Sequence, residues 1–137
     1  MRVLIDNNVV LDAIVSRAPW NEAAERIVLL VGDGELDGFI TANSATDIFY
    51  VLKKMTSTAE AKEVMGRLFK VFQVAAVTGE DCERALALPM DDFEDALIAV
   101  CAENIAADYI VSRDADFLKA KSPMTVISPI DFLEKLE

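Results

Sequence analysis

Short apolar runs alternate with longer amphipathic stretches along this chain, and this alternation constrains its fold more than any other feature. Strands that alternate with helices favour a mostly parallel sheet with helices on both faces. The pattern therefore predicts a three-layer α/β/α domain with a short, mostly parallel sheet. The predicted strands are residues 2–5, 39–40, 71–77, 109–111 and 125–127, and the predicted helices are 20–30, 44–54, 58–70, 93–107 and a last helix that starts at Pro129.

The length and composition fit one domain. The chain has 137 residues, of which 53% are hydrophobic, enough to bury a core without disulfides. We therefore expect residues 1–137 to form a single domain. No apolar run approaches the roughly 18 residues of a membrane span, and the run before Asp6 is too short for the hydrophobic region of a signal peptide. A soluble, cytoplasmic protein that does not bind a membrane is expected.

The chain contains no histidine and only two cysteines. Without histidine, Ser-His-Asp triads, His-based acid–base pairs and the usual zinc sites are excluded. Cys82 and Cys101 lack the Cys-x-x-Cys spacing, so we interpret them as buried free thiols of a reducing cytoplasm. Any catalysis must therefore depend on carboxylates, lysines, hydroxyls or a metal ion.

Four aspartates, Asp6, Asp47, Asp95 and Asp114, lie where a predicted strand ends or a predicted helix begins. In a parallel sheet these points meet along one edge, which is where α/β proteins hold ligands. Two unit charges about 4 Å apart repel by about 4 kcal/mol at an effective dielectric of 20, so clustered carboxylates need raised pKa values or a divalent cation. Oxygen ligands without His or Cys favour Mg2+ or Mn2+ over zinc.

Each acid also has a structural interpretation as part of a helix cap. Capping alone does not explain why all four acids share one edge of the sheet, whereas a metal site does. A metal site made of carboxylates is suited to phosphodiester hydrolysis by metal-activated water, because that reaction needs no protein nucleophile. The alternative caps are Asn43 or Ser44 with Asp47, Asp92 with Asp95, and Asp114 or Ser112 before Phe117.

The net charge of −11 argues, taken alone, against a nucleic-acid partner, because affinity for phosphate comes mainly from Lys and Arg. Two explanations remain open. Part of the acidity can be the site itself, neutralised by a divalent metal, and the rest can face a basic partner protein. Trp20, which follows Pro19 in a loop-like segment, is interpreted as a partly buried anchor, with base stacking as the alternative.

Three segments of the chain resemble motifs of the PIN-domain family, small metal-dependent ribonucleases that include the VapC toxins of toxin–antitoxin pairs. Residues 3–9, with Asp6 and Asn8, resemble the opening strand and its Asp-x-Asn motif. Residues 93–99 resemble the entry to the central helix, and residues 110–117 resemble the late strand and turn. The likeness spans nearly the whole chain. The departure is Asp47, where the family usually has Glu.

The resemblance implies an endoribonuclease that hydrolyses RNA with Mg2+ or Mn2+, with one or two ions in the site. It further implies a VapC-like toxin, a homodimer restrained by a cognate antitoxin. The rivals are a non-catalytic PIN-fold binding protein and an Asp-dependent phosphatase or receiver-like module. The implied catalytic and metal-binding residues are Asp6, Asp47, Asp95 and Asp114. The implied supporting residues are Asn8 and Ser112, which orient carboxylates or water, Arg113, which contacts phosphate, and Asp116, which is an outer partner of Asp114 or an alternative to it.

Overall fold

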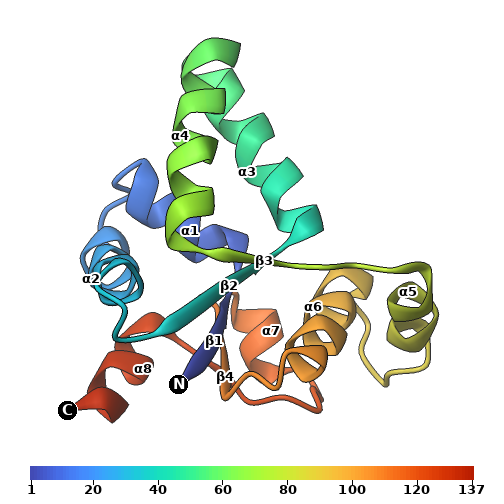
Figure 1. The fold of residues 1–137 in the computed structure, drawn as a ribbon. Coiled ribbons are helices and arrows are strands. Elements are labelled where there is room, and N and C mark those ends of the chain that lie inside the picture. Colours follow the sequence, from blue (N-terminus) through green and yellow to red (C-terminus); the bar gives the residue numbers. More distant parts are fainter.

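Five parallel strands form the centre of the protein in the computed structural model, which describes residues 1–137. The strand order is β3-β2-β1-β4-β5, and every neighbouring pair is parallel (Figure 1). The predicted short, parallel sheet is therefore confirmed. The strands are β1 (Arg2–Ile5), β2 (Asp37–Thr41), β3 (Gln73–Ala75), β4 (Tyr109–Val111) and β5 (Val126–Ile127).

Eight helices surround the sheet, and several of them differ from the prediction. The segment after Asp6 is a helix that was not predicted, and Asp6 caps it. The helix at 79–86 was not predicted, although Thr78 and Asp81 form its capping box. The helices are α1 (Asn7–Ile14), α2 (Asn21–Gly32), α3 (Ala42–Met55), α4 (Thr58–Val71), α5 (Gly79–Leu86), α6 (Phe93–Asn104), α7 (Ala115–Lys119) and α8 (Pro129–Leu136).

Two predicted boundaries were wrong. The strand expected at 71–77 covers only β3, because α4 continues to Val71 and Phe72 caps it. The helix expected at 93–107 ends at Asn104, and the chain then takes a left-handed conformation at Ala106, where φ is 54°. An α-helix cannot continue through that conformation.

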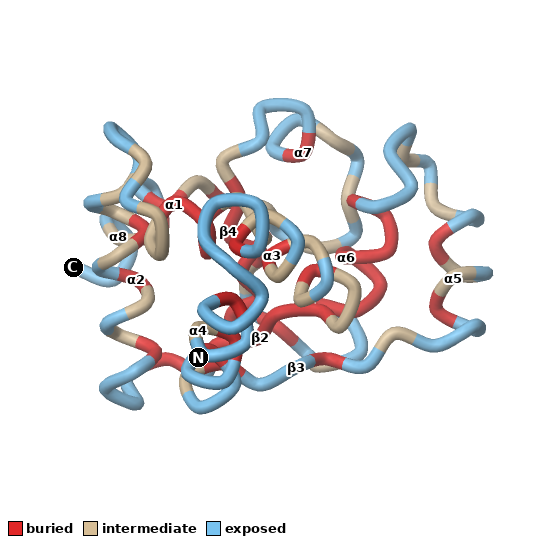
Figure 2. The backbone as a smooth tube through the Cα atoms, turned by 90° about the horizontal axis from the view of Figure 1, so that it is seen from above, coloured by how far each residue is buried: buried red, intermediate tan, exposed pale blue.

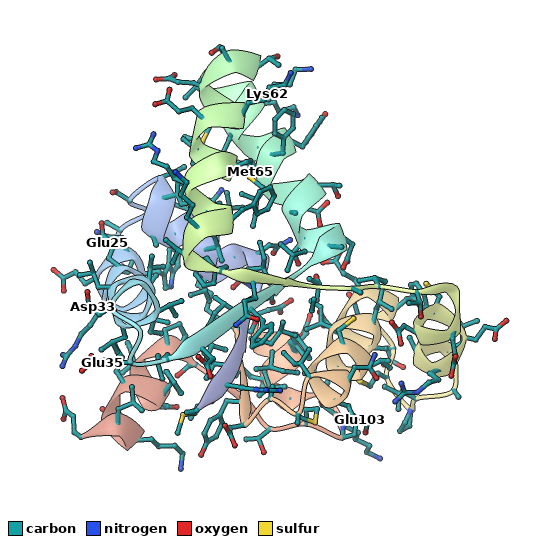
Figure 3. All side chains as sticks on the ribbon, viewed as in Figure 1. Glu25, Asp33, Glu35, Lys62, Met65 and Glu103 are labelled. Carbon is teal, nitrogen blue, oxygen red and sulfur yellow. The ribbon has the colours of Figure 1, made fainter.

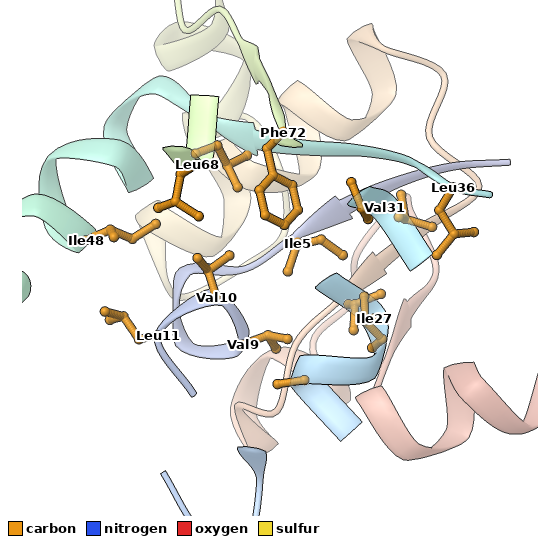
Figure 4. Packing of buried hydrophobic residues seen from close by; sticks show 14 of the residues in the cluster. Ile5, Val9, Val10, Leu11, Ile27, Val31, Leu36, Ile48, Leu68 and Phe72 are labelled. Carbon is orange, nitrogen blue, oxygen red and sulfur yellow. The ribbon is translucent and has the colours of Figure 1, made fainter. Parts of the chain in front are cut away.

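Alternate residues of the central strand pack on opposite faces of the sheet, which makes the three layers. Ile5 belongs to a cluster of 19 buried residues that also includes side chains from α1, α2, α3, α4 and α8, and Figure 4 shows Ile5 close to Val9 and Ile27. Leu4 points the other way, into a cluster of 9 buried residues with α6 and α7. In Figure 2 the buried segments run through the central strands and α6.

The helices α3 and α4 form a hairpin that extends away from the sheet (Figure 1). The base of the hairpin is anchored by Ile48 and Leu68, which are buried in the larger cluster. Close packing beside β2 requires the glycine at position 38, since a Cβ there would lie 2.6 Å from Val31 Cγ1. None of the helices is both long and apolar enough to span a membrane.

Candidate active site

Asp6 lies at the carboxyl end of β1 and is 5% exposed. It is the N-cap of α1, a position that favours Asp because its carboxylate accepts from the first free N–H groups of the helix. Its Oδ1 accepts a hydrogen bond from the Asn7 backbone N–H at 2.8 Å. Its Oδ2 accepts from Ser112 Oγ at 2.8 Å and from Asn8 Nδ2 at 3.3 Å. Three donors around one carboxylate fix its position at the sheet edge.

Ser112 joins the ends of the two central strands. The strands β1 and β4 pair directly, and the Asp6 backbone N–H donates to the Val111 carbonyl at 2.9 Å. Ser112 is fully buried, and its Oγ accepts a hydrogen bond from the Asp114 backbone N–H at 3.1 Å while it donates to Asp6. One hydroxyl therefore holds both the Asp6 carboxylate and the turn that carries Asp114. Asn8 supports the same turn, because its Oδ1 accepts from the Arg113 backbone N–H at 3.4 Å.

Asp95 lies in the first turn of α6, which begins at the same edge of the sheet. Asp92 caps this helix, as predicted, and its Oδ1 accepts from the Asp95 backbone N–H at 3.0 Å. The Asp95 side chain is 7% exposed, but no protein group donates a hydrogen bond to it. Burial, followed by the charges of Asp92, Asp6, Asp114 and Glu94, raises the pKa of Asp95 to about 7.

The charges of these acids act on one another, which shows that the fold gathers them. Burial raises the pKa of Asp6, hydrogen bonds from Ser112 and Asn7 lower it, and the charges of Asp114 and Asp92 raise it again. Because repulsion between like charges falls off with distance, carboxylates that shift one another's pKa values share one region of the protein. Asp6, Asp95 and Asp114 therefore lie in one region of the protein, and their role as metal ligands stays a prediction.

Asp47 approaches the same region from α3, although its helix begins differently from the prediction. Thr41 caps α3 and accepts from the Ser44 backbone N–H at 3.3 Å, so neither Asn43 nor Ser44 is the cap. The reason is that β2 ends at Thr41 and α3 starts directly after it at Ala42, two residues before the predicted start at 44. Asp47 is half-buried, and its Oδ2 accepts from Asn7 Nδ2 at 3.2 Å.

Two further acids belong to this cluster, and the sequence analysis assigned neither of them to it. Asp92 was interpreted only as a cap, but its charge also raises the pKa of Asp6 and Asp95. Glu94 is exposed, and burial followed by the charges of Asp47 and Asp6 raises its pKa. The signal for both was the acid-rich run at 91–95, in which four of five residues are acidic.

Models of known protein families match this chain to the PIN domain over residues 2–116. The chain belongs to the PIN domain family. No curated protein matches the sequence.

Solved structures share the fold of this PIN domain at low sequence identity. VapBC from Salmonella typhimurium, bound to DNA, has a TM-score of 0.69 and 12% identity, with 94% of this chain and 98% of that chain covered. VapBC2 from Rickettsia felis, bound to a DNA fragment from its promoter, has a TM-score of 0.66, 13% identity and coverages of 93% and 98%. VapC20 from Mycobacterium tuberculosis, a sarcin-ricin loop cleaving toxin, has a TM-score of 0.65, 16% identity and coverages of 84% and 92%. These likenesses establish the three-layer fold.

The Arg113 side chain of this PIN domain points away from the acid cluster. Its Nε and Nη2 pair with both oxygens of Asp12, the Nη2 at 3.1 Å from Oδ1. Asp12 is 1% exposed, and the Arg113 guanidinium lies 3.9 Å above the ring of Trp20. Asp12 was not predicted as a functional residue. Its only signal in the sequence is a charged side chain within the apolar segment from Val9 to Ile14. Trp20 anchors the arginine through this contact. Because Trp20 is 47% exposed, part of its surface stays free.

A cleft of about 720 Å3 opens beside the acid cluster of the PIN domain. Its walls come from the start of α6, from α7 and from the segment that follows α7. Asp116, the predicted partner of Asp114, lines this cleft, and its backbone N–H donates to Asp114 Oδ1 at 2.9 Å. The charged residues that line it are Asp91, Asp92, Asp95, Asp116, Lys119 and Lys121.

The donor chemistry of this site fits a hard divalent cation. The donors are carboxylate oxygens that repel one another, and Mg2+ and Mn2+ prefer such ligands and remove the repulsion. No group of three or more acidic side chains already encloses a position for an ion. Binding therefore requires water ligands or rotation of a side chain, and rotation of Asp95 would break no hydrogen bond of its carboxylate.

We expect the metal-free protein to lose stability as the pH rises from about 5 to about 7.5. In the folded state the pKa of Asp95 is about 7, above its ordinary value of 3.8. Between those values the folded state holds a proton that the unfolded state has released, so the free energy of unfolding falls as pH rises. Thermal melts in EDTA measure this effect.

The variant Asp95→Asn isolates the contribution of this group, since it cannot titrate. Its melting temperature should fall less than that of the wild type over the same pH range. Parallel pH profiles for the two proteins would contradict the assignment. Adding Mn2+ should raise the wild-type melting temperature more at the higher pH, where the carboxylate is ionised.

Proposed function

We propose that this protein is an endoribonuclease that hydrolyses RNA phosphodiester bonds with the help of Mg2+ or Mn2+. The observation that carries the proposal is the meeting of Asp6, Asp95 and Asp114 at the carboxyl edge of the sheet of a PIN domain, with Asp47 approaching from α3. Burial, followed by the charges of neighbouring acids that include Asp114, raises the pKa values of Asp6 and Asp95. Carboxylates gathered in this way are costly to the apo protein, and a cation that binds them offsets that cost.

The four aspartates are the residues that would hold the cation. When bound there, a divalent cation lowers the pKa of water and neutralises charge on the phosphate. The protein residues around the aspartates serve to keep them in place. Ser112 fixes both Asp6 and the turn of Asp114, and Asn8 braces that turn from α1.

The caps and the metal site are compatible uses of the same acids. Asp114 caps α7 through Oδ1, which accepts from the Asp116 backbone N–H, and no protein group donates to its Oδ2. Asp95 offers both oxygens. Asp47, Asp95 and Asp114 thus contribute to local structure through the backbone or through one carboxylate oxygen, and each keeps at least one oxygen free of hydrogen bonds. Asp6 is the exception, because both of its oxygens are hydrogen-bonded.

Incubation of the purified protein with labelled single-stranded RNA tests this function. Cleavage should occur with Mn2+ or Mg2+ and should stop when EDTA removes the metal. Intact RNA with either metal would instead favour the non-catalytic PIN-fold binding protein, whose best support is the net charge of −11.

We infer further that the protein is the toxin of a VapBC-type pair, works in the cytoplasm as a homodimer and is restrained by an antitoxin. The support is the shared fold with VapBC complexes from Rickettsia felis and Salmonella typhimurium. A basic antitoxin suits a protein of this charge, because an arginine or lysine placed among the carboxylates would neutralise them as a cation does.

A further inference from the structure

The cleft beside the acid cluster has Asp91, Asp92 and Asp95 on one wall, and Asp116 together with two lysines on another. Asp95, one of the four proposed metal ligands, lines the cleft together with Asp92 at the start of α6. Lys119 ends α7, and Lys121 follows two residues later. A strand of nucleic acid that passes over the acid cluster would therefore continue along these lysines.

Both lysines are free to bind a ligand. They are exposed, and neither makes an ion pair within 4.0 Å or donates a hydrogen bond to the protein, although four aspartates line the same cleft. By contrast, Arg113, the cation nearest in sequence to the cluster, is occupied by Asp12 and Trp20. The cleft therefore holds two positive charges that no carboxylate neutralises.

These two lysines would offset the repulsion between the negatively charged protein and a polyanionic substrate. A protein at −11 repels a polyanion, so an RNA substrate needs local cations where it meets the site. A volume of about 720 Å3 is within the roughly 300–1,000 Å3 of pockets that take drug-sized ligands. A cleft of this size can hold a short stretch of a single strand.

We propose that Lys119 and Lys121 bind phosphates of a single-stranded RNA next to the phosphodiester that is cut, and so set the path of the substrate. This proposal rests on the nuclease function proposed above. The lysines do not touch the reacting phosphate, so they act on substrate binding and not on the chemical step. Of the cleft aspartates, Asp95 is a proposed metal ligand, whereas the two lysines would contact the RNA backbone.

The test measures Mn2+-dependent RNA cleavage by the double variant Lys119→Ala/Lys121→Ala at several KCl concentrations. KM should rise by about ten-fold at low salt while kcat stays within about two-fold, which is the pattern for loss of uniform binding. The slope of log(1/KM) against log[KCl] should become shallower by about 1.4, because each phosphate contact on a single strand contributes about 0.7. The variant Lys119→Arg/Lys121→Arg should keep the wild-type slope.

A control of equal charge change separates local contacts from net charge. Lys54 and Lys62 lie at the far end of the α3–α4 hairpin, where Figure 3 labels Lys62, and the variant Lys54→Ala/Lys62→Ala should keep the wild-type slope. Thermal melts should show all variants folded, since the four side chains are exposed. An active wild type with an unchanged KM and slope in the first variant would overturn the lysine assignment alone. A wild type that cuts no RNA would overturn both proposals.

Discussion

Replacing Asp6 with Asn should reduce metal-dependent RNA cleavage by about 100- to 1,000-fold, the range found when one preorganised polar group of an active site is removed. Asn has nearly the same shape, but it lacks the negative charge that binds a divalent cation. The local structure should survive, because Asn is as good an N-cap as Asp and can still accept from the Asn7 N–H. The measurement is the initial rate of RNA cleavage with Mn2+.

The same variant should melt at the wild-type temperature or above it. Asp6 carries a buried charge next to the charges of Asp114 and Asp92, and removing it relieves both burial and repulsion. Asp33→Asn is the matched control, since Asp33 lies at the end of α2, away from α6 (Figure 3). It should retain full activity. Wild-type cleavage by the Asp6 variant would remove Asp6 from the catalytic site.

Expression of the wild-type protein in bacterial cells should stop their growth, and Asp95→Ala should restore it. The change should lower RNA cleavage by about 100-fold or more, comparable to the loss of one electrostatic contact in an active site. It should leave the fold intact, because the Asp95 side chain accepts no hydrogen bond and its backbone N–H stays paired with Asp92. Growth curves after induction, with equal protein levels on immunoblots, measure the effect.

The Asp33→Ala variant controls for the loss of one acidic side chain and should arrest growth as the wild type does. Arrest by the Asp95 variant would mean that toxicity does not depend on the acid cluster. If the wild type leaves growth unaffected while it cleaves RNA in solution, the nuclease proposal stands and the toxin proposal does not.

The structure gives Arg113 a position that its neighbourhood in the sequence did not suggest. The resemblance to the PIN-domain family implied that it contacts phosphate. Its guanidinium is instead held by the buried Asp12, and breaking such a pair leaves an uncompensated charge at a cost of about 3–5 kcal/mol when both groups are buried. Arg113 is partly exposed, so the cost here is smaller, but the pair still fastens the turn of Asp114 to α1. The phosphate contact remains a prediction that would require this pair to open.

Several features of the site follow from local sequence alone. Val3, Leu4 and Ile5 followed by Asp6 predict a strand that stops at a carboxylate, and the structure has both. Asp92 predicts the start of α6 because an N-cap acts on N–H groups within its own turn. The start of α3 was wrong for the same local reason, since Thr41, Asn43 and Ser44 are all good caps and only the length of β2 decides among them.

By itself, the sequence determined the alternation of strands and helices and the placement of four aspartates at element ends, because each of these depends on interactions within a few residues. The alternation in turn favours a parallel sheet. The tertiary structure decided which distant groups meet. Ser112 bonds to Asp6, 106 positions away in the sequence, because β4 pairs with β1. Asp12 pairs with Arg113, and Lys119 and Lys121 line the cleft at the start of α6. These contacts depend on strand order and helix packing, and many strand orders are compatible with one local pattern, so only the folded chain specifies them.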